Sequence, residues 1–244
     1  MGNRSLTCED LGRMSYAQAW DMQCQVHEKV LENKLFGAIL LVEHDPVITL
    51  SHRKTVPEHL LADQEKLTQL GIDLQPTNRG GDITYHGPGQ LVAYPILRLN
   101  DFKLTVGPYM RLLEQVVINT LETFNITANR ESGMTGVWTP PELGKLPERV
   151  FVGSELPGRG VGKICALGVR VKRGISLHGL ALNVAPDMSH FKTIVPCGLE
   201  GRSVTSLKQC LGQSCPKMSD VKRVLMKQFS VALGCEIDDA TQVS

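Results

Sequence analysis

A cysteine held between proline and glycine is the residue of this sequence best suited to nucleophilic chemistry. Cys197 ends the apolar run Ile194-Val195-Pro196 and precedes Gly198. Pro196 fixes its own φ angle and restricts the residue before it, while Gly198 leaves space beside the sulfur. A thiol held in this way would be rigid and accessible, and its thiolate form is the attacking species. A buried, inert cysteine is the alternative, and it is our interpretation of the other six cysteines.

Lys163 is the candidate partner of that thiol. It follows Gly162, where a segment rich in Pro and Gly enters an apolar run that contains Ile164 and Cys165. A solvated lysine at a strand end is one interpretation. A partly buried amine would instead have a lowered pKa and could transfer protons, and an ammonium beside a thiol lowers the thiol pKa. We expect Cys165 to be a small residue of the core.

A glycine-rich segment at residues 79–90 is the third candidate. It reads RGGDITYHGPGQ. Glycine permits positive φ angles and lets the backbone approach a ligand closely. Arg79, Tyr85 and His86 could line such a binding site. A hairpin that exposes its Arg and His to solvent is the alternative interpretation.

The elements that must position these residues alternate irregularly between helix and strand. Apolar residues at three- and four-residue spacing predict helices at 15–33, 106–124 and 219–232. Apolar runs predict strands at 38–42, 47–50, 91–99, 164–172 and 175–184, the last two joined by a short turn at Arg173-Gly174. Thr55 and Glu58 match a capping box and predict a helix to about Leu70. Val137 and Trp138 are expected to start a strand.

These elements predict an α/β (α+β) fold in which helices flank one mixed sheet, with sequential strands mainly antiparallel. We expect residues 1–244 to form a single catalytic domain. Residues 139–160 are rich in Pro and Gly and lack periodicity, so they predict an exposed insertion loop.

Charge and composition exclude several classes of protein. The 26 basic and 25 acidic side chains leave a net charge of +1, which argues against a nucleic-acid groove. No apolar stretch approaches the ~20 residues of a membrane span, and the N-terminus lacks a secretory signal. Seven cysteines without a CxxC pair argue against a disulfide framework and against a zinc site. We therefore expect a cytoplasmic protein that binds no metal, no nucleic acid and no membrane.

Four strings of the sequence together resemble one known family. RGGDITYHGPGQ, GKICALGVRV, GISLHGLALNV and IVPCGL resemble, in order and spacing, motifs of the lipoyl(octanoyl) transferases, and the similarity spans about residues 8–235. Members of that family move octanoate from octanoyl-acyl carrier protein to a lysine of a lipoyl domain. This transfer is the first step of endogenous protein lipoylation. The resemblance implies the fold of the biotin/lipoate ligase catalytic domain.

The resemblance also implies roles for individual residues. Cys197 matches the nucleophile that forms an acyl thioester, and Lys163 matches the group that lowers its pKa and acts as general acid and base. Three further stretches match substrate-binding residues of the family: Arg79, Gly80, Gly81, Asp82, Ile83, Thr84, Tyr85 and His86; Ala166, Leu167 and Gly168; Gly179, Leu180 and Ala181. The implied enzyme is a monomer without a cofactor. Its implied partners are octanoyl-acyl carrier protein and the lipoyl domains of 2-oxoacid dehydrogenase complexes and of the glycine cleavage H protein.

Two departures from the family pattern bear on how protein donors dock. The chain has Ser51-His52 after Thr49-Leu50, where the family commonly has Gly-Arg, and its 139–160 segment is longer than usual. Three rival functions stay open. An ATP-dependent lipoate or biotin ligase is the nearest, a non-catalytic acyl-binding module is the second, and a Cys/His hydrolase ranks last because no motif specifies its histidine and acid.

Overall fold

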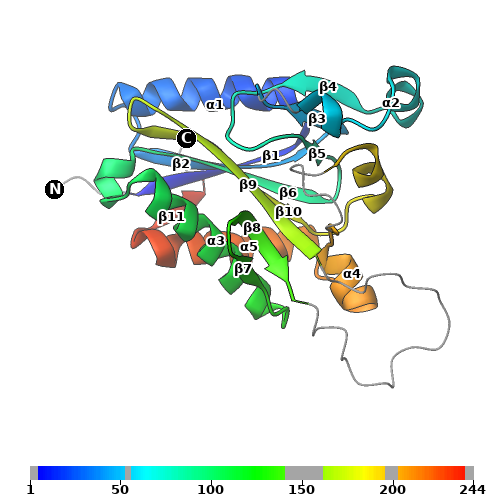
Figure 1. Ribbon diagram of the computed structural model, residues 1–244. Helices are drawn as coiled ribbons and strands as arrows, with labels where there is room; N and C mark the ends of the chain where they lie inside the picture. The colour runs from blue at the N-terminus through cyan, green and yellow to red at the C-terminus, as the bar shows by residue number, and fades with distance from the viewer. Residues whose placement is uncertain (1–4, 53–55, 141–161, 196–202, 240–244) are drawn as a thin grey trace.

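A large mixed sheet with helices on both faces organises the molecule (Figure 1). The computed structural model describes residues 5–52, 56–140, 162–195 and 203–239. Within these ranges the large sheet has eight strands, in the spatial order β11 (Ile237–Asp239), β1 (Leu6–Met14), β2 (Gly37–His44), β6 (Gln90–Leu97), β10 (Ile175–Asn183), β9 (Gly162–Lys172), β8 (Met134–Thr139) and β7 (Asn129–Glu131). This arrangement confirms the predicted fold class.

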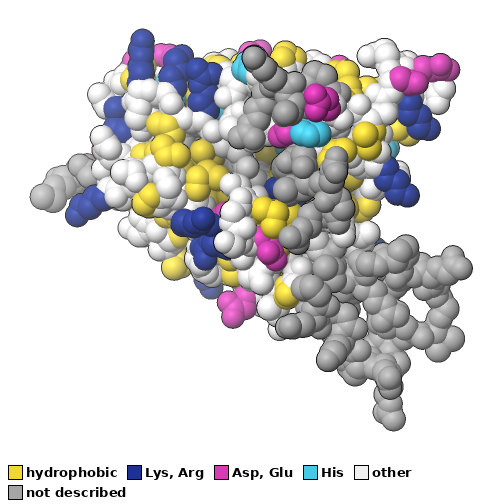
Figure 2. Space-filling view, viewed as in Figure 1, with side chains coloured by type: hydrophobic (Ala, Val, Ile, Leu, Met, Phe, Trp, Pro, Cys, Tyr) yellow, Lys and Arg dark blue, Asp and Glu magenta, His cyan; other side chains and the backbone are white. Residues whose placement is uncertain are grey.

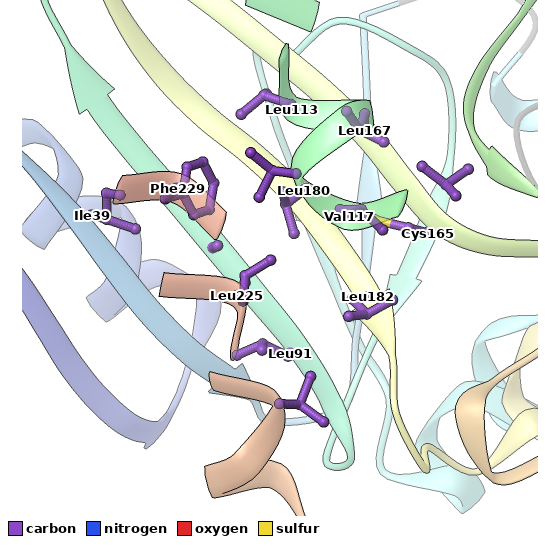
Figure 3. Close-up of a cluster of buried hydrophobic side chains, with 14 of the residues drawn as sticks. Ile39, Leu91, Leu113, Val117, Cys165, Leu167, Leu180, Leu182, Leu225 and Phe229 are labelled. Atoms are coloured by element: carbon purple, nitrogen blue, oxygen red, sulfur yellow. The ribbon is translucent and has the colours of Figure 1, made fainter. Parts of the chain in front are cut away.

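Alternating side chains of the central strands build two cores, one on each face of the sheet. On β2, Ile39 and Leu41 pack beneath the helices α3 (Val106–Thr123) and α5 (Met218–Leu233). Figure 3 shows this packing, with Leu113 of α3 and Phe229 of α5 turned toward the strands. The neighbouring β2 residues face α1 (Tyr16–Leu31) on the opposite side. Period-two alternation therefore separates the two layers of helices.

A second, three-stranded sheet lies beside the first and has the order β4 (Asp73–Pro76), β3 (Val47–Leu50), β5 (Thr84–His86). A separate hydrophobic cluster beneath it includes Ile83 and Tyr85 and reaches Ile194. Short helices complete the described chain: α2 (Gln64–Leu70), α4 (Leu207–Leu211) and the 3₁₀ turns η1 (Val56–His59), η2 (Leu99–Phe102), η5 (Met188–Thr193) and η7 (Gly212–Ser214).

Most elements predicted from local patterns are confirmed. The three amphipathic helices lie within a few residues of their predicted bounds, and Ser15 forms a capping box with Gln18 at the start of α1. The hairpin β9–β10 is antiparallel and turns at Arg173 and Gly174, which have φ angles of 52° and 79°. Two positive φ angles in a two-residue turn match the right-handed twist of the strands.

Two predictions about local structure are wrong. A single helix does not run to Leu70, because η1 ends at His59 and Asp63 caps a new helix by accepting a hydrogen bond from the Lys66 amide. Strands β2 and β3 follow each other in sequence but belong to different sheets. Neighbouring strands are mainly antiparallel, as predicted, although β1 pairs in parallel with β2 and with β11, and β3 pairs in parallel with β4.

Some predictions involve residues outside the described ranges. Thr55 of the predicted capping box is one such residue, as is most of the predicted insertion loop, since residues 141–161 are not described. Val137 and Trp138 lie at the end of β8, which starts at Met134, and not at the start of a strand. Among the described helices, none combines the length and apolarity needed to cross a bilayer.

Candidate active site

A cleft of about 460 Å³ opens where the glycine-rich segment crosses β9 and β10. Ten of the predicted substrate-binding residues line it: Arg79, Gly81, Thr84, His86, Ala166, Leu167, Gly168, Gly179, Leu180 and Ala181. The structure therefore brings three stretches that are distant in sequence to one concave surface.

Close backbone contact between the glycine-rich segment and β9 shapes the cleft. The Gly80 amide donates to the Val169 carbonyl at 3.0 Å. A Cβ atom at Gly168 would lie 2.6 Å from the Gly80 carbonyl oxygen, so only glycine allows this approach. Arg79 anchors the same segment, because its Nη2 donates to the carbonyl and the hydroxyl of Thr49 at 3.1 and 2.9 Å. The glycine-rich segment, which forms one wall of the cleft, is therefore held by the Gly80 backbone and by the Arg79 side chain.

The polar wall of the cleft carries a buried hydrogen-bond chain. His86 Nδ1 lies 2.6 Å from Gln90 Oε1, and the Gln90 amide donates to Asn183 Oδ1 at 2.9 Å. Asn183 in turn donates to the Thr205 carbonyl at 2.9 Å. The Thr205 amide donates to the Lys163 carbonyl at 3.0 Å. A continuous network therefore links the cleft to the strand that carries the candidate lysine.

Burial keeps the histidines around the cleft uncharged. Burial holds the pKa of His86 well below its ordinary value. Burial also lowers the pKa of His44 to about 4 and that of His178 to about 3. All three imidazoles are neutral at neutral pH, because desolvation disfavours the charged ring.

Four cleft residues were missed by sequence reasoning: Tyr16, Val92, Tyr94 and His178. His178 has a φ of 58° within β10, stacks on Trp20 at 4.9 Å and donates from Nε2 to Asn78 Oδ1 at 2.8 Å. Its backbone amide donates to the buried Gln23 side chain at 2.8 Å. A histidine inside an otherwise apolar strand was the available sequence signal, because a buried polar group requires specific partners.

A smaller cavity of about 270 Å³ adjoins the cleft, and we call it the lysine chamber. Thr84 and Ala166 line both cavities. The remaining residues of the chamber are Gln90, Lys163, Asn183, Phe191 and Val204. Lys163 is thus buried, with 5% of its surface exposed, and the interpretation of a solvated lysine is wrong.

Strand β8 packs closely against the Lys163 side chain. The ammonium nitrogen lies 5.4 Å from the centroid of the Trp138 ring, within the range of a cation–π contact. A Cβ atom at Gly136, whose φ is 129°, would lie 2.5 Å from Lys163 Cε. The Gly136 amide donates to the buried Glu114 carboxylate at 3.2 Å, and Arg111 and Arg130 pair with that carboxylate. A glycine is therefore required beside the amine.

Within the described part of the chain, four of the predicted substrate-binding residues line neither the cleft nor the lysine chamber. Gly80 contacts β9 through its backbone. Asp82 Oδ2 lies 2.8 Å from His59 Nδ1, and the Tyr85 hydroxyl lies 2.8 Å from His190 Nδ1. Ile83 is fully buried in the cluster of the small sheet. Alternation along β5 accounts for the position of Tyr85, since Thr84 and His86 take the opposite face.

Comparison with known proteins places this architecture in one family. A profile described as the lipoyl protein ligase A/B catalytic domain matches residues 15–230. The chain belongs to this family. An octanoyltransferase of Cytophaga hutchinsonii is 38% identical over 99% of the chain and 98% of its own length. An octanoyltransferase of Chloroflexus aurantiacus is 41% identical over 96% of each chain. A bi-partite lipoate protein ligase from Thermoplasma acidophilum shares the fold with a TM-score of 0.69 at 15% identity, covering 96% of this chain and 86% of that one.

Among the described cysteines of this lipoyl protein ligase A/B family member, Cys8 and Cys165 are buried. The interpretation as buried residues is wrong for the other four, Cys24, Cys210, Cys215 and Cys235, which are only partly buried. Burial raises the pKa of Cys165 to about 12 and that of Cys210 to about 11. The pKa values of Cys24, Cys215 and Cys235 are raised by burial as well. Cys165 is fully buried, which confirms it as a core residue. Cys197 lies outside the described residues.

The described part of the family fold offers no group of three or more His, Cys, Asp or Glu side chains arranged to hold a metal ion. On the face shown in Figure 2, Lys and Arg side chains lie in separate groups among other side chains.

Proposed function

We propose that this protein transfers an octanoyl group from octanoyl-acyl carrier protein to a lysine of a lipoyl domain, through a thioester on Cys197. The chain belongs to the family and is 38–41% identical to octanoyltransferases over nearly its whole length, so it is an acyltransferase that acts in lipoylation. The observation that carries the mechanism is the buried Lys163 amine in a chamber that shares two residues with the mainly apolar cleft. The cleft is proposed to hold the acyl chain and the chamber to hold the reacting groups.

In the first half-reaction the Cys197 thiolate attacks the carbonyl carbon of the octanoyl thioester. The bond from that carbon to the pantetheine sulfur breaks, and the leaving sulfur takes a proton from the Lys163 ammonium. The products are a free carrier thiol, an octanoyl thioester on Cys197 and a neutral Lys163 amine. A thioester is already activated, so the proposed reaction uses no ATP, no metal and no other cofactor.

In the second half-reaction a neutral lysine amine of the lipoyl domain attacks the same carbonyl carbon. Lys163 removes the proton from the incoming nitrogen, and the Cys197 sulfur leaves as a thiolate. The enzyme returns to its starting state, with an ammonium beside a thiolate. An amide bond has then replaced the thioester bond.

The chain lines the lysine chamber on both sides of residue 197, with Phe191 before it and Val204 after it. Val195, two positions before Cys197, donates its amide to the His59 carbonyl at 2.8 Å. After the undescribed residues, Ser203 lies beside the lysine, because its carbonyl accepts from the Lys163 amide at 2.9 Å. These contacts support a short path between the thiol and the amine.

The cleft offers a mainly apolar surface for the alkyl chain, in which Arg79 is the charged lining residue. Burying the six methylenes of an octanoyl group at about 0.8 kcal/mol each would contribute about 5 kcal/mol. Neutral histidines at the wall avoid the cost of placing charge beside that chain. Arg79 directs its guanidinium to the oxygens of Thr49.

The remaining parts of the proposal concern context. We place the whole chain, residues 1–244, in one catalytic domain that works as a monomer in the cytoplasm. Its proposed acceptors are the lipoyl domains of 2-oxoacid dehydrogenase complexes and of the glycine cleavage H protein. Arg79 to His86, Ala166 to Gly168 and Gly179 to Ala181 are its proposed substrate-binding stretches.

Incubation with octanoyl-acyl carrier protein, followed by intact-mass measurement and peptide mapping, tests the proposal. The expected result is one octanoyl group on Cys197, absent from Cys197→Ala and discharged by added lipoyl domain. Cys165→Ala is the matched control and should acquire the group. A Cys197→Ala chain that transfers octanoate at the wild-type rate would rule the mechanism out. Transfer that requires free acid and ATP would identify a ligase, and acyl binding without covalent attachment would identify a binding module.

A further inference from the structure

The segment from Arg79 to His86 has two faces, and only one of them lines the cleft. Arg79, Gly81, Thr84 and His86 line it. Asp82, Ile83 and Tyr85 are also buried, but they contact other parts of the chain and not the cleft. We call these three residues the outward face of the segment. These side chains therefore do not surround the acyl group, and their contacts with η1 and η5 indicate what they do instead.

The first contact of the outward face is with η1. Asp82 Oδ2 lies 2.8 Å from His59 Nδ1, and 6% of the Asp82 side chain is exposed. This contact is an ion pair whenever His59 is protonated. His59 is also the residue whose carbonyl accepts the Val195 amide. Asp82 is therefore connected to Val195 through a single intervening residue.

The segments that contain His59 and Val195 are joined by further backbone contacts. Leu60 and Ile194 form an antiparallel bridge. The amides of Leu61 and Ala62 both donate to the Thr193 carbonyl, at 2.9 and 3.1 Å. Residues 59–62 therefore act as a pairing edge for residues 193–195.

The second contact of the outward face is with η5, the turn that precedes those residues. The Tyr85 hydroxyl lies 2.8 Å from His190 Nδ1, and the Tyr85 ring packs edge-on against Phe191 at 5.2 Å. Ile83, Tyr85, Phe191 and Ile194 belong to one buried hydrophobic cluster. Phe191 itself also lines the lysine chamber.

We propose that Asp82 and Tyr85 are positioning residues that hold residues 190–195, and through them the nucleophile Cys197, against the acyl-binding segment. This inference rests on the proposed function and assigns to Asp82 and Tyr85 a role other than substrate binding. Neighbouring residues of one short segment hold the two reactants, Thr84 and His86 on the side of the acyl group and Asp82 and Tyr85 on the side of the sulfur.

Hydrogen exchange of the wild-type chain and three variants tests the anchoring without any acyl substrate. In Asp82→Asn and Tyr85→Phe we expect the amides of Leu61 and Val195 to exchange at least about 10-fold faster, because their segment opens locally. Amides of α3 should be unchanged. Tyr109→Phe is the matched control, since it removes a buried tyrosine hydroxyl that bonds the Pro95 carbonyl, away from both segments. Unchanged exchange at Leu61 and Val195 in both outward-face variants would overturn the proposal.

Transfer kinetics on the same proteins test the consequence. We expect kcat for octanoyl transfer to fall about 10- to 100-fold in Asp82→Asn and Tyr85→Phe, because small misplacements of reacting groups are costly. KM for octanoyl-acyl carrier protein should change less than about 3-fold, since the acyl contacts remain. A raised KM with unchanged kcat would assign both residues to substrate binding and overturn the proposal. A wild-type chain that transfers no octanoate, with exchange as expected, would overturn the proposed function and leave the anchoring standing.

Discussion

The cleft and the lysine chamber share two lining residues but contain different ionisable groups, histidines in the cleft and a lysine in the chamber. Around the cleft, burial lowers the pKa of His86 and His178, so these imidazoles are neutral. The chamber instead contains the Lys163 amine, held over the Trp138 ring. The cleft is mainly apolar and its histidines are neutral, whereas the neighbouring chamber contains the amine proposed to exchange protons.

This difference matches the two ends of an acyl thioester. The alkyl chain gains free energy from an uncharged surface, while the carbonyl and its sulfur need groups that carry or exchange protons. Thr84 and Ala166, which line both cavities, lie where those two requirements meet. Substitutions that alter the lysine chamber should therefore mainly slow octanoyl transfer, whereas the neutral histidines near the cleft should mainly affect how stability depends on pH.

The largest effect should come from removing the amine of the chamber. Lys163→Ala should slow both half-reactions about 10³-fold, because it removes the proposed general acid and base. Single-turnover acylation of Cys197 and discharge to lipoyl domain, each followed by intact mass, would measure the two steps. A thermal unfolding midpoint near that of the wild type would show that the loss is chemical.

Lys163→Arg sharpens this prediction. An arginine keeps the positive charge beside the thiol but does not deprotonate at neutral pH. Acylation should therefore be slowed less than discharge, which requires a neutral base. Equal slowing of the two steps would contradict a proton-transfer role for Lys163.

The next effect should come from Gly136, which lies against the amine from β8. Gly136→Ala would place a Cβ 2.5 Å from Lys163 Cε at a φ of 129°. We expect kcat to fall about 10- to 100-fold as the amine is displaced. Gly107→Ala in α3 is the matched control, because a Cβ there meets no atom within 4 Å. If the two variants had equal activity, the packing of β8 against Lys163 would be irrelevant to transfer.

The neutral histidines near the cleft predict a loss of stability in acid. Their folded pKa values, about 4 for His44 and about 3 for His178, lie below the ordinary value of 6.5. Below pH 6.5 the unfolded chain binds protons that the folded chain does not, so the free energy of unfolding falls as pH decreases. Each histidine should contribute a slope of about 1.4 kcal/mol per pH unit until its folded pKa is reached.

Urea unfolding at pH 7.5, 6.5 and 5.5 would measure that slope. His44→Gln should reduce it by the contribution of one histidine, because a glutamine cannot take up the proton. Equal slopes in the wild type and in His44→Gln would mean that His44 is not held neutral by burial.

Sequence periodicity predicted the helices and the β9–β10 hairpin because each depends on a local signal. Strand β1 was missed because its sequence, LTCEDLGRM, is largely polar, and it is held by parallel pairing with β2 and with the C-terminal β11. The helix predicted through residue 70 failed for a similar reason. The Leu61 and Ala62 amides donate to Thr193, more than a hundred residues away.

The residues of the candidate cleft were predictable in part, since ten of its fourteen lining residues were predicted, but the orientation of the side chains was not. The motifs of the resemblance identified three stretches that the structure brings to one cleft. Which side chains of residues 82–86 turn away from that cleft depends on the pairing of β5 with β3 in the small sheet. His178 was missed because its hydrogen-bond partners, Gln23 of α1 and Asn78, are distant in sequence, and no local pattern reveals them.

The smallest effect should come from Cys165, which lies on the same strand as Lys163, two residues further along. Burial raises the pKa of Cys165 to about 12, so its thiol stays protonated and inaccessible. Cys165→Ala should keep octanoyl transfer within about 3-fold of wild type and cost about 1 kcal/mol of stability, as expected for a small loss of core packing. Iodoacetamide labelling of the native wild-type chain should modify Cys197 and leave Cys165 intact. Labelling of Cys165 in the folded chain would show that the wall between the core and the lysine chamber opens, and the assignment of separate environments to the two thiols would fail.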